Sequence, residues 1–355
     1  SDVVISFYET EANASSSNNA ISTPLAYSNI SNPQTVWIRV EYLPGPVTGP
    51  GCEKLTSLEL IVNPLPVIVQ PTPLAICDDA LADAFTVFDL TLKNTEITVG
   101  DGSLEVVYYT TLVDAEAATN AIVDPTAYTN QAIGIAAANP QTLYARVTDL
   151  DTGCFDHTTL TIRVLPNPTP SPDPMDLELC DDTNSGDALE VFDLTTEEIF
   201  ILNGELGVSA TYHETLEDAE AGTNLIIDPE TYTNIESPVQ TIHVRVTNNL
   251  TGCYTLVDFD IIVNPLPNAT AVADMIACEL NTDDVFDFDL EGQSSLILGG
   301  QDPSIFELTY HASLTDAQDG INFLGSPYTN SSDPELIFVS IVNTDTGCRN
   351  TQLQF

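Results

Sequence analysis

Acidic side chains gather in the turns of this 355-residue chain, several of them directly after a cysteine. Calcium binds about six to eight oxygen ligands, mostly from carboxylates and carbonyls. We therefore interpret these turns as candidate calcium sites, although the glycine and spacing of an EF-hand loop are absent and solvated acidic turns are the alternative. The candidate ligands are Asp78, Asp79, Asp83, Asp149, Asp151, Asp181, Asp182, Asp187, Glu279, Asp283, Asp284, Asn343 and Asp345.

Two sets of cysteines recur with a similar period. The first set, here called the hairpin cysteines, follows a glycine and is spaced by 102, 99 and 95 residues. The second set, here called the leading cysteines, is spaced by 103 and 98 residues. The hairpin cysteines are Cys52, Cys154, Cys253 and Cys348, and the leading cysteines are Cys77, Cys180 and Cys278. Repeated cysteines of this kind are typical of disulfide-bonded proteins from an oxidising compartment.

Two pairing schemes are open. Pairing across a joint, such as Cys154 with Cys180, requires the chain to double back over a proline-rich linker. Pairing within a repeat joins the start of each domain to the tip of its last hairpin, and these points lie at the same end of an immunoglobulin-like fold. We favour the second scheme, which predicts Cys77–Cys154, Cys180–Cys253 and Cys278–Cys348, and leaves Cys52 to pair with a cysteine upstream of Ser1. A metal reading of the cysteines is weaker, because no CxxC spacing occurs.

Proline-rich joints and recurring phrases divide the chain. Joints begin at Asn63, Leu165 and Asn264, and the phrase YTN recurs at Tyr128, Tyr232 and Tyr328. The first residues match the middle of a later repeat, so the first repeat lacks its early strands. The predicted domains are repeat 1 (residues 1–66), repeat 2 (67–167), repeat 3 (168–267) and repeat 4 (268–355).

Short alternating runs predict an all-β fold. Leu143, Ala145 and Val147 alternate with polar residues, and a second such run follows the Thr-Gly-Cys turn, which predicts a hairpin. About seven short strands per repeat are expected, the size of an immunoglobulin-like β-sandwich. Short helices are expected at the phrases DAEAATN and DAEAGTN. Long amphipathic helices, which Rossmann and TIM-barrel folds need, are missing.

The charge balance excludes several partners. The chain has seven basic and 53 acidic residues, which gives a net charge of −46. No cationic face remains to neutralise phosphates, so nucleic acid is excluded as a partner. Direct membrane insertion is also excluded, because no apolar run approaches about 20 residues.

The arginine, histidine and remaining acidic side chains could in principle take part in binding or catalysis, but each has a structural interpretation. Arg39, Arg146 and Arg245 occupy one strand position and are expected to pair with acids or stack on aromatics. His213 and His311 stand where other repeats carry tyrosine, so neither is expected to be catalytic. Acidic residues repeat in every unit and form no unique pair for glycosidase chemistry. We therefore predict no catalytic residues and no enzymatic activity.

The phrases LCDD, VFDLT, ILGGQDPS, TYH, DAE, PETYTN, QTIHVRV, NNLTGC and VNPLP, taken in order, resemble a known group of repeats. They are similar to the repeats of large flavobacterial surface proteins exported by the type IX secretion system, of the kind that carries a gliding-motility-associated C-terminal sorting domain. The acidic loop of that group often reads CDDDNDGF, and this chain departs from it at residues 80–82, 185–186 and 279–280.

The resemblance implies an extracellular location on the cell surface. It also implies a structural stalk of an adhesin or filament-like protein, in which neighbouring repeats of the chain are one another's partners. A second hypothesis is an adhesive module whose aromatics, such as Trp37, Tyr144 and Phe338, contact surface glycans or a partner chain. A third is a filament subunit that assembles with copies of itself by β-strand addition.

Overall fold

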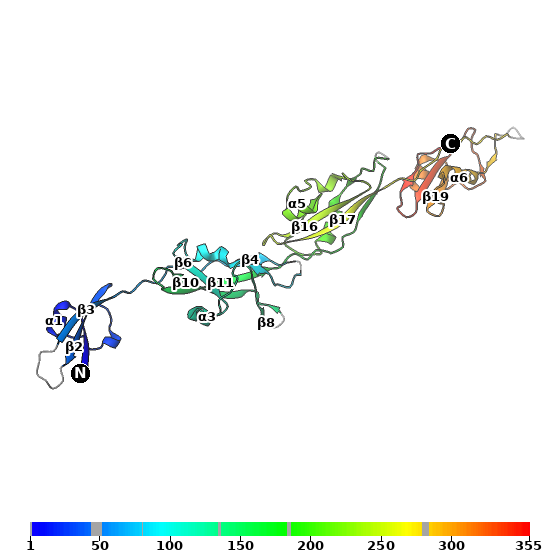
Figure 1. Ribbon diagram of the computed structural model, residues 1–355. Coiled ribbons are helices and arrows are strands. Elements are labelled where there is room, and N and C mark those ends of the chain that lie inside the picture. The colour runs from blue at the N-terminus through cyan, green and yellow to red at the C-terminus, as the bar shows by residue number, and fades with distance from the viewer. Residues whose placement is uncertain (1, 44–51, 80, 134–135, 183–185, 279–283) are drawn as a thin grey trace. The chain divides into compact units, whose positions relative to one another are not determined.

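The computed structural model describes residues 2–43, 52–79, 81–133, 136–182, 186–278 and 284–355. It is an all-β chain of tandem repeats, which confirms the predicted fold class (Figure 1). The chain divides into two compact units, residues 1–76 with 83–164 and residues 77–82 with 165–355. We describe each repeat by itself.

Repeat 3 shows the complete arrangement. Its main sheet has the order β12 (Leu177–Cys180), β17 (Tyr254–Asn264), β16 (Val239–Asn248) and β14 (Val208–His213). A small second sheet pairs β13 (Val191–Phe192) with β15 (Tyr232–Thr233). The helical segments are η3 (Leu194–Glu197), α4 (Glu198–Ile201), α5 (Leu216–Ala221) and η4 (Pro229–Thr231).

Repeat 2 has the same main sheet, in the order β4 (Leu74–Cys77), β11 (Phe155–Leu165), β10 (Gln141–Asp149) and β6 (Leu104–Tyr109). Small sheets pair β5 (Val87–Phe88) with β7 (Tyr128–Thr129) and β8 (Ala132–Ile133) with β9 (Ala136–Ala137). Its helical segments are η2 (Leu90–Lys93), α2 (Asn94–Ile97) and α3 (Leu112–Ala117). The helices α3 and α5 confirm the two predicted from the DAEA phrases.

The two outer repeats contain subsets of these elements. Repeat 1 has β1 (Asp2–Tyr8), α1 (Glu11–Ser16), η1 (Pro24–Ala26), β2 (Gln34–Leu43) and β3 (Cys52–Leu60), with the strands in one sheet. Repeat 4 has β18 (Asp287–Phe288), α6 (Glu291–Leu298), β19 (Phe306–His311), α7 (Leu314–Asp319), β20 (Tyr328–Thr329), β21 (Phe338–Asn343) and β22 (Arg349–Asn350).

The core follows the predicted alternation. Leu143, Ala145 and Val147 of β10 are fully buried, as are Ile242 and Val244 of β16. Opposite them, alternate residues of β11 and β17 complete the same apolar layer. Each buried leucine, isoleucine or valine of this kind stabilises the fold by about 1.5–3 kcal/mol relative to an exposed one. The long hairpin is therefore the element around which repeats 2 and 3 pack.

The Thr-Gly-Cys turn closes that hairpin through one glycine. Gly153, Gly252 and Gly347 all adopt positive φ angles, between 73° and 77°. Residues with a Cβ rarely adopt this conformation, whereas glycine does so without strain. Each glycine N–H donates to the carbonyl of the turn's first residue, as from Gly252 to Asn248 at 2.9 Å. The turn thus fixes where the following hairpin cysteine lies.

Candidate functional site

The structure contains two disulfides, and both join neighbouring repeats. Cys77 bonds to Cys253 and Cys180 bonds to Cys348, each with a Cα–Cα distance of 5.5 Å. Each bond connects the leading cysteine of one repeat with the hairpin cysteine of the next. The predicted pairs Cys77–Cys154, Cys180–Cys253 and Cys278–Cys348 are therefore wrong, and so is the alternative pairing of Cys154 with Cys180.

The direction of one short strand explains this correction. β12 runs parallel to β17, with Leu177 opposite Ile261 and Cys180 opposite Asn264. Cys180 therefore lies beside the last residue of β17, whereas Cys253 directly precedes its first residue. The strand between these ends is about 33 Å long. A disulfide needs Cα atoms within about 7 Å, so the two cysteines of one repeat cannot pair.

The hairpin cysteines instead lie against the joint of the preceding repeat. Cys348 Sγ is 3.9 Å from the carbonyl oxygen of Asn264, the last residue of β17. Cys154 has a matching contact, with Sγ 4.0 Å from the carbonyl oxygen of Asn63. The recurring Asn-Pro joint that precedes each hairpin cysteine by about one repeat is a signal that sequence reasoning missed.

Three cysteines form no disulfide within the described residues: Cys52, Cys154 and Cys278. Cys52 and Cys278 are exposed, and Cys154 is half-buried. The pairing of Cys52 with an upstream cysteine remains a prediction.

The acidic turns have several different structural roles. One carboxylate oxygen each from Asp78, Asp79 and Asp83 lies within 4.8 Å of the others. We expected Asp149 and Asp151 to lie near Asp78 because a Cys77–Cys154 bond would bring them together. Cys77 bonds to Cys253 instead, so this reason no longer applies. Asp149 Oδ1 instead accepts hydrogen bonds from the backbone N–H groups of Asp151 and Thr152, at 2.9 and 3.0 Å.

The other predicted ligands fall in two further turns. Asn343 Oδ1 accepts from the N–H of Asp345 at 3.0 Å, which repeats the Asp149 arrangement and stabilises the hairpin turn. Asp181 is buried, whereas Asp182, Asp187 and Asp284 are exposed. Glu279 and Asp283 lie outside the described residues.

The three arginines hold short helices onto the sheet. The Nη1 group of Arg245 donates to the carbonyls of Ala219 and Glu220, at 2.9 and 2.7 Å. Its guanidinium also lies 3.3 Å from the ring centroid of Tyr254. Arg146 and Arg39 make the corresponding bonds to α3 and α1, and Arg146 stacks on Phe155. A cation at a helix C-terminus satisfies otherwise unpaired carbonyls.

In repeat 4 an arginine from a different strand caps the corresponding helix, α7. Ser340 stands at the arginine position, and Arg349 of the neighbouring strand donates to the Ala317 carbonyl at 3.2 Å and to Ser340 Oγ at 2.6 Å. Four of the seven basic residues therefore cap helix ends in this highly acidic chain. This supports the structural interpretation of the arginines.

The two histidines at the tyrosine position are buried and fully bonded. His213 Nδ1 lies 2.8 Å from the Thr223 carbonyl, and Nε2 lies 3.0 Å from Thr211 Oγ1. His311 makes the same contacts with Ile321 and Thr309. Both ring nitrogens are thus occupied in holding a loop onto the strand.

The helices α3, α5 and α7 each carry a hydrogen-bonded aspartate in their first turn. The Thr215 hydroxyl and the Asn224 amide both donate to Asp218 at 2.7 Å, and these bonds lower the pKa of Asp218 from its usual value. Asp114 and Asp316 have lowered pKa values for the same reason. The ionised form is therefore favoured by folding.

We expect Asp218→Asn to lower the melting temperature at neutral pH. A depressed folded-state pKa stabilises above the unfolded pKa of about 4 and is lost as pH falls through the folded pKa. The difference between the two proteins should therefore shrink below about pH 4. Thermal melts from pH 3 to 7 measure it, with Glu217→Gln in the same helix as a charge-matched control that should show no such convergence.

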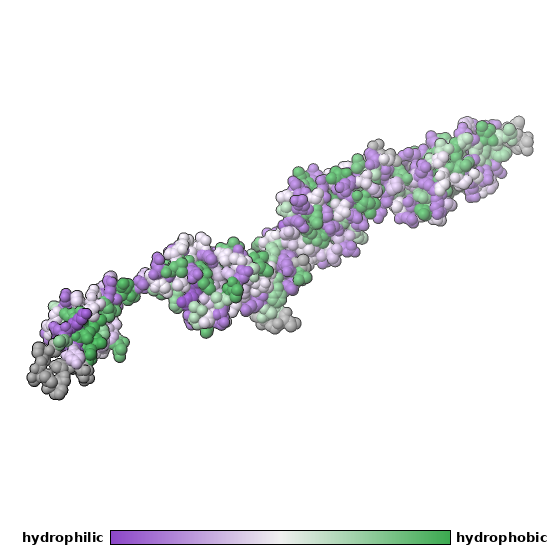
Figure 2. Space-filling view, viewed as in Figure 1, coloured by the Kyte–Doolittle hydropathy of each residue, from purple (hydrophilic) through white to green (hydrophobic). Residues whose placement is uncertain are grey.

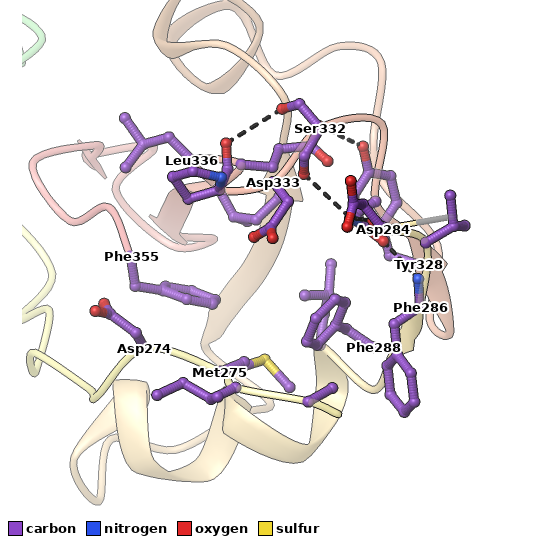
Figure 3. Close-up of a pocket in the computed structure, with 18 residues that line it drawn as sticks. Asp274, Met275, Asp284, Phe286, Phe288, Tyr328, Ser332, Asp333, Leu336 and Phe355 are labelled. Atoms are coloured by element: carbon purple, nitrogen blue, oxygen red, sulfur yellow. Dashed lines mark hydrogen bonds between the residues drawn. The ribbon is translucent and has the colours of Figure 1, made fainter. Parts of the chain in front are cut away.

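A pocket of about 550 Å³ lies in repeat 4 (Figure 3). Phe355, Met275 and Phe288 line it, with Asp333 facing them across the opening. The sheet ladder ends beside it, where Ile337 and Phe355 exchange backbone hydrogen bonds. In repeat 3 the corresponding pair is Ile242 and Phe259, and β17 continues with the buried Ile261 and Val263.

The pocket therefore occupies the position that strand residues fill in repeat 3. Its lining contains the acidic residues Asp274, Asp284, Asp333 and Glu335 and no histidine, lysine or arginine. Assembly by strand addition remains a prediction.

The outer-face aromatics are only partly accessible. Trp37, Tyr144 and Phe338 are all half-buried. Tyr144 shares its face of β10 with Arg146, whose bonds hold α3 over that face. On the face visible in Figure 2, polar and apolar residues are interspersed. Binding of glycans through these aromatics remains a prediction.

The geometry defines a class of protein: tandem all-β repeats in which the leading cysteines of repeats 2 and 3 bond to the hairpin cysteine of the next repeat. The chain belongs to the Flavobacterium inter-domain disulphide bond domain family, whose model matches residues 1–66, 73–170, 176–267 and 274–355. This places it among flavobacterial repeat proteins. No helix in the described part of the chain has the length and apolar character needed to cross a membrane.

Three solved structures of tandem domains show low similarity to this chain. Titin domains I67–I69 align at 10% identity and a TM-score of 0.25, covering 74% of this chain and 88% of that one. Drosophila N-cadherin EC1-4 aligns at 12% identity and 0.19, covering 91% and 82%. Chicken CNTN1 FN1-FN3 aligns at 11% identity and 0.24, covering 81% and 98%. No curated protein matches the sequence.

Proposed function

We propose that this chain is a non-catalytic, load-bearing stalk of an exported cell-surface protein. One observation carries the proposal: the two disulfides overlap along the sequence. The first closes residues 77–253 and the second closes residues 180–348, so residues 180–253 lie inside both loops. Overlapping bonds of this kind make repeats 2, 3 and 4 one covalent network.

The network changes how tension passes along the chain. One disulfide joins residue 77 to residue 253, and the other joins residue 180 to residue 348. Three chain segments therefore connect the same two covalent junctions: residues 77–180, 180–253 and 253–348. The middle segment, residues 180–253, is the shortest and limits the extension of all three. Even a fully unfolded repeat would thus yield little length under force. A stalk exposed to flow or surface drag benefits from this limit, whereas catalysis has no use for it.

An outer-surface location is supported by two features. Stable disulfides require an oxidising environment, and the net charge of −46 favours solubility and repulsion between neighbouring molecules. The family is flavobacterial, and the route of export that we propose is the type IX system implied by the resemblance of the repeat phrases. Gliding motility and adhesion are the processes in which such a stalk would present a binding tip.

Labelling of intact flavobacterial cells tests the location. An antibody raised against residues 168–267 should bind unpermeabilised cells, and the signal should vanish after external protease treatment. Labelling that appears only after permeabilisation would overturn the proposal. An antibody to a periplasmic protein is the control for cell integrity.

A further inference from the structure

Two buried carboxyl side chains lie beside residues 181 and 182, directly after Cys180 of the Cys180–Cys348 disulfide. Asp181 and Glu190 are each only 5% exposed. The backbone holds both in place: the Asp181 N–H donates to the Asn264 carbonyl at 2.9 Å, and the Glu190 N–H donates to Asn234 Oδ1 at 2.7 Å. Glu190 Oε1 in turn accepts from the N–H of Asp182, at 2.9 Å. The two carboxyl groups therefore approach the same short stretch of backbone.

One oxygen of this pair has no hydrogen-bond donor. Asp181 Oδ2 accepts from the Gly186 N–H at 2.7 Å. Asp181 Oδ1 is buried and has no hydrogen-bond partner. None of the salt bridges among the described residues involves Asp181. Burying a carboxylate oxygen without a donor or a cation is costly.

The neighbouring repeats show that the fold does not need this second acid. Thr86 of repeat 2 and Phe286 of repeat 4 stand at the position of Glu190, because their N–H groups donate to Asn130 and Asn330 in the same way. Threonine and phenylalanine thus satisfy the same backbone geometry. The buried acid at residue 190 is therefore particular to repeat 3.

We propose that Asp181 Oδ1 and the Glu190 carboxylate bind a divalent cation, and that calcium fits this site best. Calcium takes hard oxygen ligands in an adaptable geometry, and water can complete its coordination shell. The ion supplies the positive charge that the buried oxygen lacks. It would also fasten the loop that follows Cys180 to β13, next to the inter-repeat disulfide.

Calorimetric titration of the oxidised, EDTA-treated chain with calcium chloride at constant ionic strength tests the site. Wild-type protein should bind calcium with a Kd of about 10⁻⁴–10⁻³ M and melt at a higher temperature when calcium is present. Asp181→Asn and Glu190→Thr should each weaken this component by at least about tenfold. Glu190→Thr copies the residue of repeat 2 and should fold. Asp182→Asn removes an exposed neighbouring charge and should leave binding unchanged.

Three results would overturn the proposal. The first is calcium binding by Asp181→Asn and Glu190→Thr that equals the wild type, which would assign the ion to other acidic turns. The second is an absence of calcium binding by the wild-type chain. The third is a rise in melting temperature on calcium addition that is as large for Asp181→Asn and Glu190→Thr as for the wild type, which would show that calcium stabilises the chain at another place.

Discussion

Reduction of the disulfides should lengthen the stretched chain by about 670 Å, at about 3.4 Å for each released residue. In the oxidised protein the span from Cys77 to Cys348 can extend only to its shortest covalent path, which is the segment 180–253. In the reduced protein the whole segment 77–348 extends, because neither bond shortens the path. Single-molecule stretching between the chain ends, with and without a thiol reductant, measures the difference.

The same experiment distinguishes pairing schemes. Bonds within repeats would leave only the segments 154–180 and 253–278 extensible between Cys77 and Cys348, which makes the oxidised span shorter by about 75 Å. A Cys52→Ala/Cys278→Ala protein is the matched control, because it removes two thiols that form no disulfide in the structure. It should extend like the wild type. An oxidised length equal to the reduced length would contradict the proposed stalk mechanism.

Removal of the second disulfide should cost about 5 kcal/mol of unfolding free energy. The bond joins residues 168 positions apart, and the chain-entropy model gives about that value for loops of this size. Cys180→Ala/Cys348→Ala retains the buried surroundings of Cys348 without adding a polar group. Urea unfolding followed by far-ultraviolet circular dichroism should show an earlier transition for repeats 3 and 4.

The control variant for this measurement also separates the hypotheses. Cys278→Ala should change the free energy of unfolding by less than about 0.5 kcal/mol, as expected for an exposed residue without a special contact. If Cys278 were bonded to Cys348, its removal would destabilise repeat 4 by about 4 kcal/mol. Equal losses in the two proteins would contradict the inter-repeat pairing.

Local pattern predicted the hairpin well and the cysteine pairing poorly. The alternation at Leu143, Ala145 and Val147 directly encodes which face of β10 is buried, so the strand and its core side were predictable. The short strand β12 carries no comparable signal for direction. Whether Cys180 lies at the near or far end of β17 depends on a parallel pairing between segments far apart in the sequence. That register is a tertiary property.

The acidic residues show the same limit. Asp149 and Asn343 head Asx turns, a role that their position before Thr-Gly-Cys could have indicated. The burial of Asp181 and Glu190 depends on contacts with Asn264 and Asn234, far away in the sequence. Sequence composition could name Asp181 as a ligand but could not show that one of its oxygens lacks a partner.

Peptide mapping under non-reducing conditions tests the inter-repeat network most directly. Trypsin alone is insufficient, because the chain lacks Lys and Arg between residues 245 and 349, which leaves Cys253, Cys278 and Cys348 in one fragment. Cleavage at aspartate separates them, since Asp258 and Asp284 lie between successive cysteines. The structure predicts linked peptides that contain Cys77 with Cys253 and Cys180 with Cys348. Recovery of Cys180 with Cys253, or of Cys77 with Cys154, would contradict the network and the load-bearing role built on it.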